Sequence, residues 1–422
     1  MTKKTLWVAA FAAIFAVASP SAVVHAADET QHATERTDHD ALASFVRQIV
    51  DTHPSVSAAR AALDASSAYE AAASRPLYNP ELEFEAEDTD VETRTVGISQ
   101  TLDWGGKRRA RFSVAEAQRQ AVAAEFVATR WQVSVELLTA LADYQTENER
   151  RKLAESRAAA MQDFADLSRQ RFDGGDISQI DFDLAVLANT QARMQLATTV
   201  ASVAEAKQAV ANYVGRTPTS RWPSMDVQLP AIKAGSSAED EVMLLPEVRA
   251  AQLTAEAASA NVTLRRRERR VDPTLSLRGG KEGDESLVGL NITVPLPVRN
   301  SFRHEVTAAD AEYRQASEQL SNISQRAYAR YLGAQDRYEI AQGAWHDWQT
   351  TGDTSLQSQN DTLRRLWQAG ELSTTDYLVQ LTATLGVQES ALDLREALWR
   401  AWFEWLWASG QVDAWLGQGA YR

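Results

Sequence analysis

Four segments of the chain alternate apolar and polar residues with a period of two. In the first, residues 81–87, glutamates occupy one face and Leu82, Phe84 and Ala86 the other. Comparable alternation runs over residues 95–104, 275–278 and 288–296. This pattern predicts β-strands with one apolar and one polar face, as found in a soluble antiparallel sheet or in a transmembrane barrel. Taken alone, the alternation favours the soluble sheet.

Long stretches without proline surround these segments. No proline occurs over residues 81–217 or after Pro297. Because proline costs a helix interior about 3 kcal/mol, the Ala-, Glu- and Arg-rich tracts 105–172 and 299–368 are predicted to form long helices. Glycine-containing turns are predicted to end these helices at Gly174–Gly175 and at Ala369–Gly370. Return helices over 177–214 and 372–409 would then complete two antiparallel hairpins.

The two halves of the chain repeat one another. Val96-Gly97-Ile98 matches Val288-Gly289-Leu290, and the landmarks follow one order at nearly constant spacing in both halves. A charged stub, a short apolar run and small residues before Ala27 predict a cleaved signal peptide. The predicted organisation is a signal peptide (1–26), an N-terminal segment (27–52), a first repeat (53–215, strands within 80–104, hairpin tip near 174–178), a linker (216–244), a second repeat (245–410, strands within 273–296, tip near 369–373) and a tail (411–422).

Composition and motifs exclude several kinds of function. The chain has no cysteine, and its formal charge of −14 disfavours nucleic-acid binding. Gly105-Gly106-Lys107-Arg108 lacks the spacing of a phosphate-binding loop. His32 and His39 lie among acidic residues that could loosely hold a divalent metal, but we expect a disordered, solvated segment there. The sequence therefore predicts no catalytic residue, no cofactor and no metal site.

Four strands cannot close a transmembrane barrel, because open sheet edges leave backbone groups unpaired in lipid. Closed barrels need at least eight strands, so strands placed in a membrane would require further copies of the chain. Two copies would give eight strands and three copies twelve, with a wider lumen. Helical hairpins of this length also cannot bury their apolar stripes alone, which predicts lateral packing.

Three stretches carry a family resemblance: residues 79–83, 97–111 and 272–276. With the duplicated order of elements, they make the chain similar to the TolC-like outer-membrane efflux factors, and within them to the CzcC-like branch that serves heavy-metal resistance-nodulation-division (RND) pumps. Where relatives tend to carry Asn-Gln-Gly after the fourth strand, this chain has Arg299 to His304. That departure weakens a finer assignment.

The resemblance implies a mainly α fold with a small β part. Duplicated helical hairpins would form a trimeric α-barrel, and four strands per chain would contribute to a twelve-stranded β-barrel. The homotrimer would sit in outer-membrane lipid with a large periplasmic portion, its partners being a periplasmic membrane-fusion adaptor protein and an inner-membrane RND pump.

The resemblance also assigns roles to particular residues. Asp181 and Asp376 would form a periplasmic gate, although both could equally be acids favoured near a helix N-terminus. Glu83 and Glu85 would line the lumen. The residues that would contact the adaptor at the two tips, or else only link helices, are Gly174, Gly175, Asp176, Ile177, Ser178, Gly370, Glu371, Leu372 and Ser373.

The function implied is that of an outer-membrane channel subunit that passively conducts divalent heavy-metal cations from periplasm to exterior. One alternative is an outer-membrane factor for multidrug efflux or type I protein secretion. An alternative of another class is a soluble periplasmic coiled-coil adaptor or scaffold. Four tryptophans near the C-terminus are expected to pack the last helix or to lie near the membrane interface: Trp399, Trp402, Trp405 and Trp407.

Overall fold

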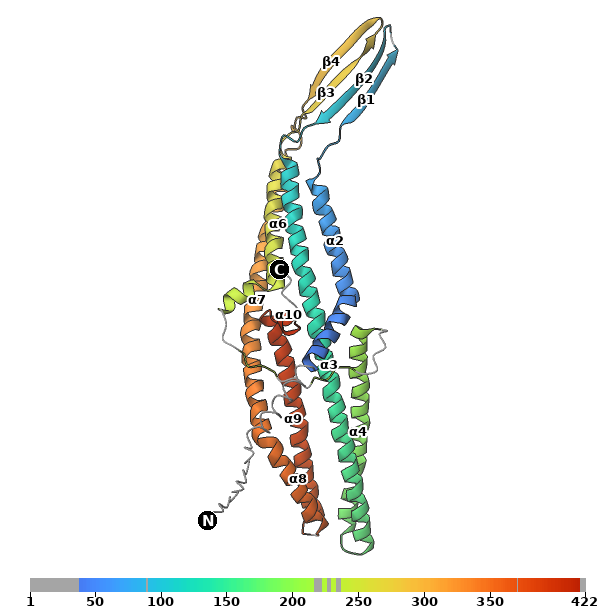
Figure 1. Ribbon diagram of the computed structural model, residues 1–422, viewed down its shortest axis with the longest axis vertical. Helices are drawn as coiled ribbons and strands as arrows, with labels where there is room; N and C mark the ends of the chain where they lie inside the picture. Colours follow the sequence, from blue (N-terminus) through green and yellow to red (C-terminus); the bar gives the residue numbers. More distant parts are fainter. Residues whose placement is uncertain are drawn as a thin grey trace, which may run out of the picture.

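The chain folds into a long, thin molecule with a small sheet at one end and two helical tips at the other (Figure 1). The computed structural model describes residues 38–88, 90–215, 222–225, 229–232, 237–369 and 371–417. The predicted signal peptide lies outside the described residues, as do His32, Gly370 and parts of the linker and tail. Within the described ranges, no helix is both long enough and apolar enough to cross a bilayer.

The first half of the chain forms α2 (Pro54–Ser74), α3 (Lys107–Asp173) and α4 (Gln179–Val214). Helix α3 extends over 67 residues without a break. It begins after Gly106, whose φ of 68° is in the left-handed region that favours glycine. The carboxylate of Asp103 accepts hydrogen bonds from the N–H groups of Lys107 (2.7 Å) and Arg108 (2.8 Å) and so caps the helix.

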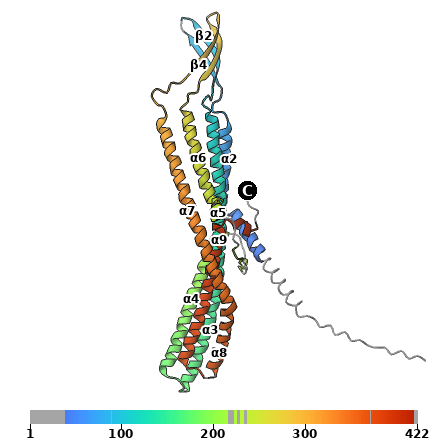
Figure 2. The same cartoon turned by 90° about the vertical axis from the view of Figure 1, so that its left-hand side faces the viewer.

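The second half repeats this plan with α5 (Ala238–Met243), α6 (Pro246–Glu268), α7 (Arg303–Asp347), α8 (Asp353–Gln368), α9 (Thr374–Ala408) and α10 (Val412–Trp415). The helical tract predicted over 299–368 is not one continuous α-helix. A π-helical turn, η1 (Trp348–Gly352), separates α7 from α8. A Cβ at Gly352 would lie 2.2 Å from the Trp348 ring, so the turn packs an indole where only glycine leaves room. Figure 2 shows the change of direction between α7 and α8.

The four strands form one antiparallel sheet in the order β1 (Glu81–Asp88), β2 (Glu92–Thr101), β3 (Thr274–Glu282) and β4 (Glu285–Thr293). Each half of the chain therefore supplies one hairpin, and β2 pairs with β3 across the duplication. Strands β1 and β4 remain at the two open edges. The sheet stands clear of the helices at the end of the molecule (Figure 1).

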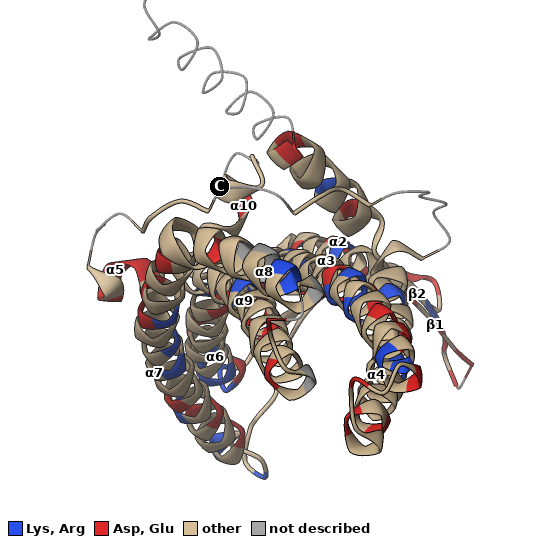
Figure 3. Cartoon of the chain, turned by 90° about the horizontal axis from the view of Figure 1, so that it is seen from below, with Lys and Arg blue, Asp and Glu red and all other residues tan. Residues whose placement is uncertain are grey.

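The helices form a curved layer rather than a bundle around a central core. In the half nearer the tips, neighbours in contact follow the order α7, α9, α3, α4; nearer the sheet the order is α7, α6, α3, α2. Figure 3, which looks along the molecule from the tips, shows this layer as an arc. Helices α7, α4 and α2 are therefore at its borders.

The main apolar core lies at the middle of the molecule, where Tyr338 and Phe403 are fully buried. Residues 38–52 form a helix whose Leu42 and Val46 belong to this core. The expectation of a disordered, solvated N-terminal segment was thus wrong for these residues. Their apolar side chains recur every three or four positions, so they share one face of the helix and pack against the core. Trp399, Trp402 and Trp405 of α9 are buried in the same core, which lies away from the sheet. Trp407 on the same helix is half-buried.

Candidate functional site

The sheet exposes its apolar face. Phe84 is 74% exposed, Leu290 67% and Val288 81%. The pairing register places them on one face, which also carries Leu82, Ile98, Leu275, Leu277 and Ile292, all exposed. A soluble sheet covers such a face against a core, since about 25 cal/mol is gained per Å² of apolar surface removed from water. No helix in the described part of the chain packs on this sheet (Figure 1).

The polar face is the more enclosed of the two. Thr95 is 5% exposed and Ser99 2%, although both are polar. Glu83 and Glu85 extend from β1 on this side, and Glu85 accepts a hydrogen bond of 3.2 Å from Thr95. The sheet is therefore inverted relative to a soluble one, because its apolar face is uncovered and its buried residues are small ones on the polar face of β2 and β3.

A buried carboxylate joins the sheet to the helices. Asp272 accepts hydrogen bonds from the Tyr78 hydroxyl (2.8 Å) and the Gly105 N–H (3.3 Å), and its other contact is the Lys107 ammonium at 2.9 Å. Burial by itself would raise the pKa of Asp272, but these three partners outweigh it and hold the pKa below its usual range. The Asp-Trp-Gly-Gly-Lys stretch that carries the family resemblance thus builds this junction.

The two hairpin tips share a backbone hydrogen bond that closes the turn. In the first, Gly175 has a φ of +81° and the Asp176 N–H donates to the Arg171 carbonyl at 2.8 Å. In the second, the Glu371 N–H donates to the Leu366 carbonyl at 3.0 Å. Both arrangements satisfy helix-terminal carbonyls in a narrow turn. The two tips lie beside each other at the foot of the molecule (Figure 1), and most of the residues predicted to contact an adaptor are exposed there.

The two predicted gate acids are capping residues in this structure. The Ser178 hydroxyl accepts from the Asp181 N–H at 3.2 Å, and the Asp181 carboxylate accepts from Ser178 in return. Ser373 and Asp376 repeat the arrangement, with 3.0 Å from the Asp376 N–H to the hydroxyl. The repeated Ser-x-x-Asp spacing that the sequence shows is therefore a helix-start signal.

Aromatic side chains connect the first hairpin to the second just above the tips. Trp367 of α8 stacks on Tyr377 of α9 with ring centroids 4.8 Å apart, and Phe164 of α3 packs against both. The Arg171 guanidinium lies 4.4 Å from the centre of the Trp367 ring and donates to the Trp367 carbonyl at 3.2 Å. These contacts hold the two tips together within one chain.

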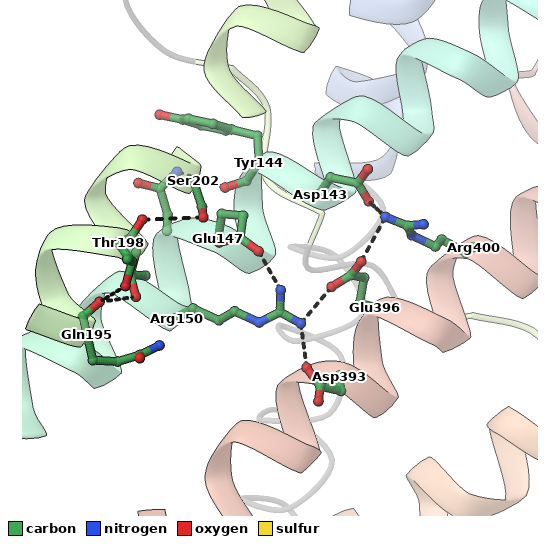
Figure 4. Close-up of polar contacts among 12 residues, drawn as sticks. Asp143, Tyr144, Glu147, Arg150, Gln195, Thr198, Ser202, Asp393, Glu396 and Arg400 are labelled. Atoms are coloured by element: carbon green, nitrogen blue, oxygen red, sulfur yellow. Dashed lines mark hydrogen bonds and ion pairs between the residues drawn. The ribbon is translucent and has the colours of Figure 1, made fainter. Parts of the chain in front are cut away.

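Between this aromatic cluster and the main core, α3 and α9 are joined by ion pairs (Figure 4). Arg150 lies 2.5 Å from Asp393 and 2.9 Å from Glu396, and also pairs with Glu147. These carboxylates raise the pKa of Arg150 in spite of its burial. The remaining pairs of this ladder are Arg157–Glu389, Glu149–Arg395 and Asp143–Arg400.

A family match covers much of the first repeat. Residues 45–216 match the family described as outer membrane efflux protein. The cobalt-zinc-cadmium resistance protein CzcC of Cupriavidus metallidurans is 28% identical over 238 residues, which cover 53% of this chain and 55% of that protein. The matched region thus spans about half the length of this relative.

Solved structures share the fold over most of the chain. CusC superposes with a TM-score of 0.73 at 15% identity, covering 90% of this chain and 92% of CusC. The outer-membrane channel OprN gives 0.74 at 16% identity, over 88% of this chain and 91% of its own. The outer membrane protein VceC of Vibrio cholerae gives 0.71 at 19% identity, over 87% and 96%.

The chain is thus similar to the outer membrane efflux protein family over residues 45–216, and it shares the fold of outer-membrane channels over most of its length. The predicted fold class, duplicated long helical hairpins with a small β part in the TolC-like arrangement, is confirmed by the fold shared with these channels. The family is one of channels rather than of enzymes. Among the residues that the structure describes, no group of three or more His, Cys, Asp or Glu side chains is placed to hold a metal ion.

Sequence reasoning missed the ion-pair ladder. Its partners lie more than two hundred residues apart, for example 243 between Arg150 and Asp393. One signal was present: Arg150 and Arg157 on α3, and Glu389 and Glu396 on α9, are each separated by two helical turns. Such spacing places like charges on one helix face and indicates a partner helix of opposite charge.

We expect Arg150→Gln to loosen α9 from α3, because Glu147 and Asp393 would lose their guanidinium partner and Glu396 would keep only Arg400. Amide hydrogen exchange around residues 393–396 should become about tenfold faster. Arg151→Gln is the matched control, since Arg151 pairs with Glu155 of its own helix at 2.5 Å. Equal exchange rates in the two variants would show that the ladder does not hold the helices.

Proposed function

We propose that this protein is the outer-membrane channel subunit of a tripartite efflux system, and that three copies form a passive conduit from periplasm to exterior. The observation that carries the proposal is the inverted sheet, whose exposed apolar face suits lipid and whose opposite, polar face suits water. An inner-membrane RND pump would supply the energy, and a periplasmic adaptor would connect the pump to the conduit.

The open edges of the sheet support assembly from several copies. Strands β1 and β4 each present an unpaired row of backbone N–H and C=O groups, which lipid cannot satisfy. Pairing β4 of one copy with β1 of the next removes both edges. Three copies of a four-stranded sheet then give a twelve-stranded ring with room for a lumen.

The helical layer has matching open borders. On α4, Ile180, Leu187 and Met194 follow one another at intervals of two helical turns, and all three are exposed. On α7 at the opposite border, Leu332 and Ile340 are exposed. Apolar residues at this spacing form the contact surface of packed helices. Helix α4 of one copy could therefore pack against α7 of the next. A closed tunnel of helices results.

The polar face supports a preference of the conduit for cations. Glu83 and Glu85 extend from β1 on the side that would line the lumen, and rings of carboxylates attract cations and repel anions. At the other end, the narrow tips expose backbone and polar side chains, including Asp176 and Glu371. We assign these tips to the contact with the adaptor.

Assembly is tested by fractionation and gel mobility. We expect the protein in the outer-membrane fraction, soluble only with detergent, and running as a trimer until it is heated. Leu187→Lys should weaken the trimer because it places a charge in the contact surface between α4 and α7, while Leu187→Met keeps the apolar area and should behave as wild type. A detergent-independent monomer would contradict the channel and favour the soluble adaptor or scaffold.

The gate assignment rests on Asp181 and Asp376, which three copies would bring together as rings of carboxylates near the tips. In planar bilayers, Asp376→Ala should raise the single-channel conductance and weaken block by divalent cations severalfold. Ser373→Ala is the control, because it removes the hydroxyl that accepts from the Asp376 N–H at 3.0 Å but keeps the carboxylate. If both variants change the currents alike, Asp376 acts only as a helix cap.

The proposed cargo is divalent heavy-metal cations, supported by the similarity to a protein named for cobalt, zinc and cadmium resistance. The chain has no cysteine and few methionines or histidines, so the pump would select the metal. A strain lacking this gene should become sensitive to these metals and keep its resistance to drugs. Drug sensitivity with unchanged metal tolerance would indicate the multidrug alternative, and loss of a secreted protein would indicate type I secretion.

A further inference from the structure

The polar face of the sheet carries a single basic side chain among its four strands. In the pairing register, Arg278 of β3 shares a face with Glu83, while Arg94 and Lys281 are on the apolar side. The remaining charged residues of the polar face are all acidic: Glu81, Glu83, Glu85, Glu87, Glu282 and Glu285. Arg278 is therefore the one positive charge on a sheet face whose other charged residues are negative.

Two glycines make room for this side chain. Arg278 pairs with Gly97 on one neighbouring strand and with Gly289 on the other. A Cβ at Gly289 would lie 3.0 Å from Arg278 Nε and 3.1 Å from its Cγ, and a Cβ at Gly97 would lie 3.3 Å from its Cβ. The side chain therefore lies close over the backbone of β4, where a larger residue would displace it.

The guanidinium is directed at one of the lumen acids. Arg278 Nη1 lies 3.4 Å from a carboxylate oxygen of Glu85, and both side chains remain about half exposed. An exposed pair at this distance adds little stability. Its consequence is electrostatic, because it offsets the charge of Glu85 at the middle of the strand while leaving Glu83 and Glu87 uncompensated.

We propose that Arg278 is a specificity-determining residue of the conduit: seated over Gly97 and Gly289, it sets a positive charge beside Glu85 and limits the preference of the lumen for cations. This inference rests on the proposed function, since it requires the polar face to line a water-filled path. In a trimer the three copies form a ring of guanidinium groups. Anions then meet a local site of favourable potential, and cations are held less tightly than by carboxylates alone.

The test is the reversal potential of the full-length protein in planar bilayers under a potassium chloride gradient. Arg278→Gln should raise the ratio of cation to anion permeability by about twofold or more at low salt, with a smaller change at high salt because ions screen the fixed charge. Arg278→Lys keeps the charge and should stay near wild type. Lys281→Gln removes one charge from the same strand on the opposite face and should leave the ratio unchanged.

A second variant moves the charge without deleting it. Gly289→Ala would push the guanidinium away from the strand, and we expect the conductance to fall because the side chain would project further into the lumen. A conducting Arg278→Gln channel with unchanged permeability ratio overturns the role of Arg278 and leaves the channel function intact. A wild-type protein that carries no ionic current contradicts the conduit itself.

Discussion

The structure depends on one constraint, which is that the four-stranded sheet turns its apolar face outward and leaves both edges unpaired. In water this arrangement would expose Phe84, Val288 and Leu290 and would invite uncontrolled pairing of β1 and β4 with other strands. In lipid the apolar face is favourable, and the edges can be satisfied by further copies of the same sheet. The proposed assembly of several copies would pair both edges of the sheet and cover the open borders of the helical layer.

The duplication explains why one chain supplies two similar hairpins, and the structure shows where the two have diverged. Helix α3 is continuous over 67 residues, whereas its counterpart is interrupted by the π-helical turn at Trp348–Gly352. The second hairpin is thus bent where the first is straight. Near the tips the two hairpins are joined by the contact of Arg171 with Trp367, so the two repeats pack against each other within a single chain.

Apolar clusters and ion pairs hold the helices together at different levels along the molecule. The core around Tyr338 and Phe403 fixes the middle, and the cluster around Phe164 and Trp367 fixes the region above the tips. Between them α3 and α9 are joined by ion pairs centred on Arg150 and Arg400 and by a small apolar cluster that includes Met161 and Leu385. Burial raises the pKa of Asp143 within the ion-pair network. Neutralising one member of the ion-pair network leaves part-buried charges without a partner, which is a cost that the apolar clusters do not have.

Local patterns in the sequence determined the elements themselves. Alternation in 81–87 fixed which strand face is apolar, proline-free tracts located the helices, and Ser178 and Ser373 marked helix starts, because each depends on residues close along the chain. Tertiary structure alone decided which distant residues meet: the pairing of β2 with β3, the contact of Arg150 with Asp393, and the docking of residues 38–52 on the core. It also decided that the apolar sheet face stays uncovered, since alternation reports two different faces but not what packs against either.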